Sequence, residues 1–177
     1  MADPAPISFA RGAPSYDIVD VEGLREATRR AAEGKLAWAT PYGGAAGFPP
    51  LREWLAAKHG VDPARVLVTN GSMQADAFLF DELAGPGVDV VVERPTYDRT
   101  LLGLRERGAT LHAIGLEDDG LDVAELQARL DGGLEPAFAH ILPTFHNPAG
   151  CTLSLAKRRE LVGLADARGF LIFEDDP

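Results

Sequence analysis

Short apolar, β-branched runs alternate with helix-forming stretches from residue 65 onward, and this alternation constrains the fold more than any other feature of the chain. Strands are predicted at about 65–69, 88–93, 109–114, 137–142 and 170–174. Helical patterns lie between them and end at Gly or Pro. Strands that alternate with helices pair in parallel and carry helices on both faces. The sequence therefore predicts an α/β fold, with three layers around a mostly parallel sheet.

The N-terminal part has a different character. Residues 1–20 contain three Pro and little periodicity, which indicates an arm that packs on another surface. A helix is predicted at 21–32, and a loop at 39–50, where three Pro and three Gly surround Tyr42. We therefore expect residues 1–50 to form an arm and a small-domain segment, and residues 51–177 to form most of a larger domain.

Composition and charge exclude several classes of protein. The 177 residues carry a net charge of -10, so a concentrated basic surface for nucleic acid or an anionic membrane is not expected. One Cys and four scattered His show no zinc spacing, and no metal site is expected. No stretch is apolar enough to span a membrane, and the N-terminus lacks the features of a signal peptide. A cytoplasmic protein is expected.

Polar residues follow the first predicted strand, at the start of a helix. Gly71, Ser72 and Met73 would present free backbone amides and a hydroxyl to an anion, helped by the helix dipole. The alternative is that Ser72 only caps its own helix. The stretch is neither a Walker loop nor a Gly-x-Gly-x-x-Gly fingerprint.

Three further residues follow later predicted strands. Tyr97 could stack on a flat ligand or plug the junction between strand and helix, and Asn147 could donate to a ligand or belong to an ordinary Asn-Pro turn. Asp175 could hold the protonated nitrogen of a heteroaromatic ring, because charge-assisted hydrogen bonds are strong. Its alternatives are a helix N-cap or a solvated carboxylate. Carboxyl ends of parallel strands share one edge, where open α/β sheets hold ligands.

Imine chemistry on a carbonyl group requires a lysine. The chain has only three, Lys35, Lys58 and Lys157, and none falls where a predicted strand ends. The stretch from Ser154 to Lys157 matches Ser-x-x-Lys, but it is better interpreted as a capped first helical turn.

Taken together, these motifs resemble the class I/II aminotransferases of fold type I, which use pyridoxal 5′-phosphate. The resemblance is greatest to a subgroup that contains 2-aminoadipate and aromatic aminotransferases and the effector domains of related transcription regulators. It extends over nearly the whole chain from Ile7. The matching stretches are Tyr42-Gly43 with Gly47 and Leu51-Arg52, then 68–75, 92–97, 146–150 and 174–177.

The resemblance implies a role for each motif. Gly71, Ser72 and Met73 would bind the cofactor phosphate, Tyr97 would stack on the pyridine ring, Asn147 would bond the ring 3-oxygen and Asp175 would pair with the ring nitrogen. Tyr42 would reach the phosphate in a neighbouring subunit, which implies a homodimer. Gly12 would lie near the substrate carboxylate. Met73 and His146 each stand where the family commonly has Gln.

The resemblance also implies a function for a longer parent protein, of which this chain resembles the N-terminal part. The parent would move an amino group from an amino acid to a 2-oxo acid in amino acid metabolism. The Schiff-base lysine of the family has no counterpart here, so the chain would hold the incomplete cofactor-binding large domain and be inactive alone. The alternatives are the effector domain of a transcription regulator, a lyase or decarboxylase with the same cofactor, and a nucleotide binder that uses the turn at Asn70–Met73.

Overall fold

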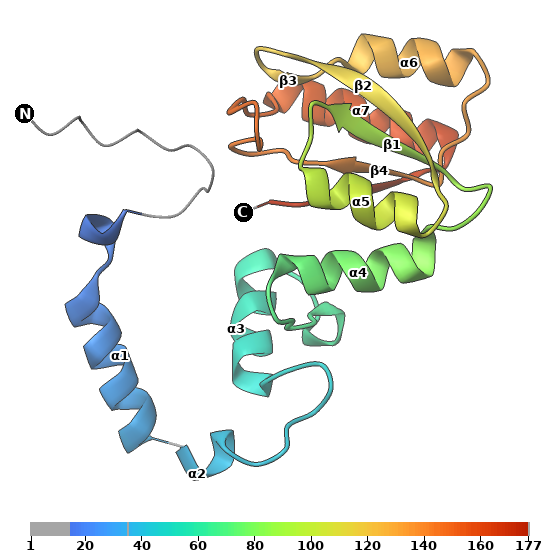
Figure 1. The fold of residues 1–177 in the computed structure, drawn as a ribbon. Helices are drawn as coiled ribbons and strands as arrows, with labels where there is room; N and C mark the ends of the chain where they lie inside the picture. Colours follow the sequence, from blue (N-terminus) through green and yellow to red (C-terminus); the bar gives the residue numbers. More distant parts are fainter. Residues whose placement is uncertain (1–14, 35, 177) are drawn as a thin grey trace, which may run out of the picture. The chain divides into compact units, whose positions relative to one another are not determined.

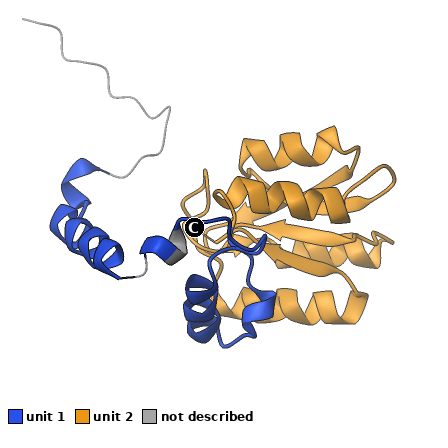
Figure 2. Ribbon diagram, turned by 90° about the horizontal axis from the view of Figure 1, so that it is seen from below, with its two compact units in different colours: residues 1–68 blue, residues 69–177 orange. Residues whose placement is uncertain are grey.

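The computed structural model describes residues 15–34 and 36–176, so Gly12 and Lys35 lie outside the described residues. The chain divides into two compact units, residues 1–68 and residues 69–177 (Figure 2). Within the described residues, no helix has the length and apolarity needed to cross a bilayer.

The first unit is helical. Its elements are a 3-10 turn η1 (Tyr16–Ile18), α1 (Val21–Glu33), α2 (Leu36–Ala39), α3 (Pro49–His59) and η2 (Pro63–Arg65). The predicted helix at 21–32 is confirmed as α1, which begins where the Asp20 side chain accepts a hydrogen bond from Gly23 N–H. The predicted loop at 39–50 is too long at both ends. Helix α3 begins already at Pro49, because Pro suits the first turn of a helix, where its missing N–H is not needed.

The strand predicted at 65–69 is wrong. Arg65 ends η2, and residues 66–69 are irregular. Their backbone groups find partners outside any sheet, since Val68 N–H donates to the Ala46 carbonyl at 3.0 Å and the Arg52 side chain donates to the Val66 carbonyl at 2.7 Å. A β-branched run forms a strand only where a second strand accepts its hydrogen bonds.

The second unit is built on a sheet. Its elements in chain order are α4 (Ser72–Leu83), β1 (Asp89–Arg94), α5 (Asp98–Glu106), β2 (Thr110–Glu117), β3 (Gly120–Leu121), α6 (Val123–Asp131), β4 (Phe138–Ile141), α7 (Leu155–Arg168) and β5 (Leu171–Glu174). The described residues form a five-stranded sheet of order β3-β2-β1-β4-β5, in which β2, β1, β4 and β5 are parallel. Four of the predicted strands and the mostly parallel sheet are confirmed.

Strand β3 was not predicted. It pairs antiparallel with the end of β2 in a short hairpin. Gly120 makes the hairpin possible, because its φ of +104° is strained for other residues and a Cβ there would lie 2.7 Å from Cα of Leu153. Such a tight contact is set by a distant part of the chain and leaves no periodic signal in the sequence.

Helices cover both faces of the sheet, as Figure 1 shows. On one face, Phe80 of α4 and Leu104 of α5 pack with Val90, Val92 and Phe138. On the other face, residues of α6 and α7 form a second cluster with alternate residues of the same strands. The consecutive residues Val90–Val92 are fully buried because neighbours point to opposite covered faces. The predicted three-layer α/β fold is confirmed.

Candidate functional site

The chain changes direction across the sheet between β1 and β4. After β1 the chain crosses to β2 on one side, and β4 then returns to the other side of β1. The loops that follow β1 and β4 therefore diverge and open a crevice at the carboxyl edge of the sheet. Ligands of open α/β sheets bind at such a switch point.

A pocket of about 210 Å³ lies at this edge. Residues from four separate segments form its wall: Ser72, Met73, Tyr97, Leu142, Phe145, Asn147 and Asp175. Five of the predicted site residues therefore meet in one place, although they are spread over more than 100 positions of the chain. They come from the start of α4, the start of α5, the loop after β4 and the residue after β5.

The start of α4 forms one side of the pocket. Gly71 is the N-cap residue, with a φ of +79° and no side-chain hydrogen bond to the helix, and Ser72 is already the first helical residue. The alternative in which Ser72 caps the helix is therefore wrong. An uncapped helix start leaves backbone N–H groups available, and the helix dipole favours a negative charge there.

Hydrogen bonds within the loop and one from α7 fix the backbone of the loop that carries Asn147. His146 N–H donates to the Cys151 carbonyl at 2.8 Å, and Gly150 N–H donates to the His146 carbonyl at 2.6 Å. The Arg158 side chain of α7 donates to the Pro143 carbonyl at 2.9 Å. Asn147 is exposed at the tip, so its amide is available to a ligand while its backbone is fixed.

A buried carboxyl group, that of Glu93, binds the backbone where this loop begins. Oε2 of Glu93, the penultimate residue of β1, accepts a hydrogen bond from Leu142 N–H at 2.8 Å. The same oxygen lies 3.1 Å from Nε2 of His146, without the alignment of a hydrogen bond, and both side chains are almost fully buried. Burial raises the pKa of Glu93 to about 7, against the lowering effect of the Leu142 bond. Burial also lowers the pKa of His146, which is therefore neutral at pH 7.

We expect Glu93 to make stability depend on pH. Between pH 4.5 and about 7 the unfolded chain has lost the Glu93 proton while the folded chain keeps it, so the free energy of unfolding falls as pH rises through this window. Replacement Glu93→Gln should remove roughly 1–3 kcal/mol of this fall, because one pKa unit corresponds to about 1.4 kcal/mol. Urea unfolding at pH 5 and pH 8 measures it. The exposed Glu135→Gln is the control, and parallel pH curves for wild type and Glu93→Gln would contradict the assignment.

Asp175 is half-buried and lines the pocket. Its backbone N–H donates to the Ile141 carbonyl at 2.9 Å, which continues the pairing of β4 with β5 by one residue. Burial, and then the charge of Asp176, raises the pKa of Asp175. Asp176 itself is exposed.

Other residues singled out in the sequence lie elsewhere. Tyr42 belongs to the first unit, and its side chain is fully exposed. Lys157 pairs with Glu117 and Asp119 at 2.5 Å and 2.6 Å, and Lys58 lies 5.7 Å from the Trp54 ring centroid. No lysine of the described residues lines the 210 Å³ pocket.

Sequence reasoning missed three titratable residues of this region, namely Glu93, Asp76 and His140. Each was interpreted as part of a helix or strand pattern. The sequence feature that could have identified two of them is a polar residue among buried apolar ones. Asp76 stands one helical turn before the buried Phe80, and His140 stands within the apolar strand β4. Buried polar groups of this kind require partners, which the sequence does not name.

The fold and the pocket together define an α/β protein whose pocket at the switch point suits a ligand with an anionic end beside α4 and a cationic or hydrogen-bonding end beside Asp175. Comparison with known families names the class. The chain belongs to the aminotransferase class I and II family, whose model matches residues 5–176.

Individual relatives agree with this family. Aromatic-amino-acid aminotransferase 1 of Thermococcus litoralis is 34% identical over 97% of this chain and 43% of its own length. The 2-aminoadipate transaminase of Thermus thermophilus is 31% identical over 98% of this chain and 43% of its own length. The chain thus spans less than half the length of these relatives.

A solved structure shows the same fold. The α-aminoadipate aminotransferase LysN of Thermus thermophilus, complexed with N-(5′-phosphopyridoxyl)-L-leucine, superimposes with a TM-score of 0.85 at 30% identity. The match covers 94% of this chain and 42% of that protein.

Proposed function

We propose that this chain supplies the pyridoxal 5′-phosphate pocket of an aminotransferase, which moves an amino group between an amino acid and a 2-oxo acid. One observation carries the proposal: Ser72, Met73, Tyr97, Asn147 and Asp175 converge on one pocket at the switch point. Family membership and the phosphopyridoxyl-leucine complex of the Thermus thermophilus protein support it.

The residues of the pocket fit the chemistry of this cofactor. Backbone amides at Gly71–Met73 and the Ser72 hydroxyl suit a phosphate dianion, because the N-cap residue Gly71 has no side chain that could accept from these amides. The Tyr97 ring suits stacking on the pyridine, and the Asn147 amide suits donation to the ring 3-oxygen. The Asp175 carboxylate suits a protonated ring nitrogen.

Each residue then has a task. The start of α4 orients the cofactor by its phosphate, Asn147 sets the angle of the ring and Asp175 holds a proton on the ring nitrogen. The bound cofactor supplies an electron sink for negative charge that develops on the amino acid Cα. No residue of this chain is assigned as the lysine that carries the cofactor.

The remaining features belong to the same proposal. Residues 1–50 are the arm and small-domain segment, and residues 51–177 belong to the large domain. The protein acts as a homodimer in the cytoplasm, with Tyr42 contacting the neighbouring subunit's cofactor phosphate and Gly12 lying near the substrate carboxylate. The full exposure of Tyr42 and the absence of buried residues in α1 are consistent with surfaces that a second subunit covers.

A second candidate is the effector domain of a transcription regulator. The HTH-type regulator YcxD of Bacillus subtilis is 30% identical over 98% of this chain. Both candidates use the same pocket, so cofactor binding does not distinguish them. Transfer of amino groups by the protein, measured as formation of 2-oxo acid, favours the enzyme, whereas binding of a specific DNA duplex without amino transfer favours the regulator.

We expect the full chain to bind pyridoxal 5′-phosphate through the start of α4. Replacement Ser72→Asp puts a negative charge beside the phosphate and should weaken binding on the order of tenfold, because the helix start then repels the anion. Absorbance titration after removal of unbound cofactor measures this.

Pyridoxal, which has no phosphate, is the control ligand. Its weaker binding should be the same in wild type and Ser72→Asp. Equal affinity of wild type and variant for pyridoxal 5′-phosphate would contradict the assignment of the phosphate site. Borohydride reduction followed by peptide mass mapping separates cofactor in the pocket from cofactor attached to Lys35, Lys58 or Lys157.

A further inference from the structure

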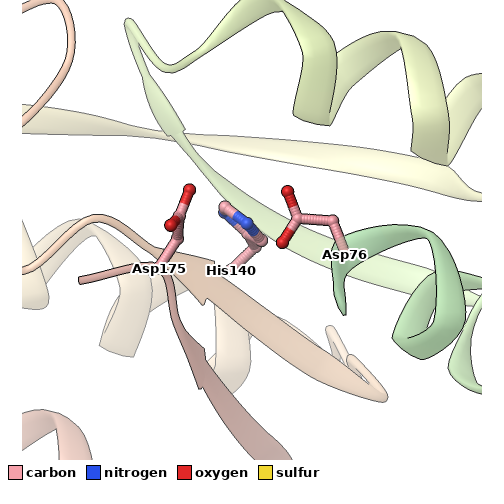
Figure 3. A group of neighbouring side chains, drawn as sticks. All are labelled: Asp76, His140 and Asp175. Carbon is pink, nitrogen blue, oxygen red and sulfur yellow. The ribbon is translucent and has the colours of Figure 1, made fainter. Parts of the chain in front are cut away.

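Three side chains that carry metal-binding atoms meet beside the pocket, namely Asp76, His140 and Asp175 (Figure 3). One ligand atom of each lies within 4.8 Å of those of the other two. The three come from α4, β4 and the residue directly after β5, so only the folded chain brings them together. Their separation along the chain explains why the spacing of Cys and His in the sequence does not indicate this group.

His140 lacks the partners that a buried imidazole needs. The residue is 0% exposed, and neither ring nitrogen has a hydrogen-bond partner among the described residues. Its ring lies between the carboxyl groups of Asp76 and Asp175, and the rings of Phe80 and Phe173 pack edge-on against it, with centroids 5.8 Å and 4.9 Å away. Burial lowers the pKa of His140 to about 4, so the ring is neutral, the form that binds metal ions. Packing thus fixes an imidazole whose nitrogens are free to bind a ligand.

The two carboxyl groups have no cationic partner in the protein. Asp76 is only 8% exposed and Asp175 is half-buried. Neither takes part in any of the ion pairs formed within residues 15–34 and 36–176. Two buried carboxylates close to each other are unfavourable, and a divalent cation between them neutralises both charges.

The nearest arginines are already paired with other carboxylates. Arg99 and Arg107 line the same pocket as Asp76. Arg107 pairs with Asp81 at 2.6 Å, and Arg99 lies 3.9 Å from Asp98. The group of Asp76, His140 and Asp175 therefore keeps an excess of negative charge.

The geometry of the three side chains suits an ion of the size of Zn²⁺. Bonds from Zn²⁺ to His nitrogen and Asp oxygen are about 2.0–2.2 Å long, so the ligand atoms of a tetrahedral ion lie about 3.3 Å apart. From 4.8 Å the carboxyl oxygens need to approach by about 1.5 Å at most, which rotation of the two aspartate side chains supplies while His140 stays fixed. An ion can enter from either side, because Asp76 lines a pocket of about 310 Å³ between α4 and α5, and Asp175 lines the pocket of about 210 Å³.

We propose that Asp76, His140 and Asp175 bind one divalent transition-metal cation, such as Zn²⁺, when the cofactor is absent. The imidazole favours Zn²⁺ over Mg²⁺ and Ca²⁺, which prefer oxygen ligands alone. Three protein ligands leave a fourth position for water. Asp175 is shared with the cofactor, and a bound cation repels the protonated ring nitrogen, so the ion and the cofactor exclude each other. This exclusion rests on the proposed function, whereas the metal site itself does not.

The first experiment titrates the full chain, without cofactor and without a histidine tag, with Zn²⁺ in a calorimeter. Burial, and then the charge of Asp175, raises the pKa of Asp76 to about 6, so a pH of about 7.5 limits competition by protons. Wild type should bind one Zn²⁺ per chain. Asp76→Asn and His140→Phe should each weaken the affinity by about tenfold or more, because each removes one of three ligands.

Two control variants test whether the ion binds elsewhere. Glu82→Gln changes an exposed carboxylate on α4, the helix that carries Asp76. His112→Gln changes another imidazole beside a carboxylate, since His112 lies 2.8 Å from Asp89. Both should bind Zn²⁺ as wild type does. Equal affinity of wild type, Asp76→Asn and His140→Phe overturns the inference, and so does a loss of binding with His112→Gln alone.

Nitrogen-15 NMR of the histidine rings identifies the ligand directly and does not depend on a variant that folds. Addition of Zn²⁺ should shift one ring nitrogen of His140 and leave those of His112 in place. Absence of a shift at His140 when one equivalent of Zn²⁺ is bound overturns the inference. Asp76→Asn keeps the shape of its side chain, and the Phe ring of His140→Phe matches those of Phe80 and Phe173, so far-UV circular dichroism should be unchanged in both.

The second experiment tests the exclusion, with an analogue of pyridoxal 5′-phosphate in which a methyl group replaces the aldehyde, so that it forms no imine. A saturating amount of the analogue should weaken Zn²⁺ binding by about tenfold or more, and Zn²⁺ should weaken binding of the analogue by the same factor, as linkage requires. Unchanged Zn²⁺ affinity in the presence of bound analogue overturns the exclusion. Absence of analogue binding by wild type instead overturns the proposed function, and the first experiment still decides the metal site.

Discussion

Replacement of Phe138 by Ala is expected to lower the free energy of unfolding by about 3–5 kcal/mol, the usual cost of removing a fully buried aromatic ring. Phe138 lies on β4 between β1 and β5 and is 0% exposed. Its ring stacks on Phe80 of α4 with a centroid separation of 6.3 Å. Removing it leaves a cavity where the sheet meets α4, and the hydrogen-bonded strands on either side limit how far that cavity can collapse.

Phe78→Ala is the matched control for Phe138→Ala. The Phe78 side chain stands on α4 and is 50% exposed, so its loss should cost about 1 kcal/mol or less. Urea unfolding followed by far-UV circular dichroism measures both variants. Tryptophan fluorescence would not report on this unit, because the chain's two Trp, Trp38 and Trp54, both lie in residues 1–68. Equal destabilisation by the two variants would contradict the described core.

Replacement of Asp175 by Asn is expected to weaken binding of pyridoxal 5′-phosphate roughly 10- to 100-fold. Asn keeps the shape of the side chain but cannot pair as a charge with the ring nitrogen, and a hydrogen bond to a charged group contributes about 1.5–3 kcal/mol. The variant should not unfold more easily than wild type, because Asp175 is half-buried and close to Asp76, and its removal relieves repulsion. Weaker binding without loss of stability separates a role in the site from a role in folding.

The neighbouring Asp176→Asn is the control for this variant. Asp176 is exposed and does not line the pocket, so its replacement should change cofactor affinity by less than about threefold. Absorbance titration at pH 7 measures both variants. A comparable loss of affinity with Asp176→Asn would show that general negative charge at the end of β5, rather than the Asp175 carboxylate, holds the cofactor.

Two groups of buried polar residues lie next to the pocket, one beside the loop of Asn147 and the other beside Asp175. Glu93 lies under the loop of Asn147, on the side of the sheet that α6 and α7 cover. Asp76 and His140 lie behind Asp175 on the α4 side. Both groups contain a carboxyl group whose pKa is raised by burial. The free energy of unfolding therefore falls at both places as pH rises toward 7. Apolar residues at the same positions would not cause this fall.

Much of the site could be predicted from the sequence. Tyr97, Asn147 and Asp175 each stand in the turn that follows an apolar strand or directly after that strand, and parallel strands bring such turns to one edge. The alternation of strands and helices likewise predicted the layered α/β fold. The wrong strand at 65–69 shows the limit of the same reasoning, since a β-branched run is compatible with a strand but does not supply its partner.

Only the tertiary structure decided which groups meet in the interior. The order β3-β2-β1-β4-β5 makes β1 and β4 neighbours, so that the loops after them diverge and open the crevice. Burial turns Glu93, Asp76 and His140 into titratable groups with shifted pKa values. Local patterns are set by neighbouring residues, so the sequence by itself determined four strands of the sheet, the helices between them and the polar residues that follow the strands. Strand order and burial arise from contacts between residues far apart in the chain, so the buried polar residues beside the site became visible only in the folded structure.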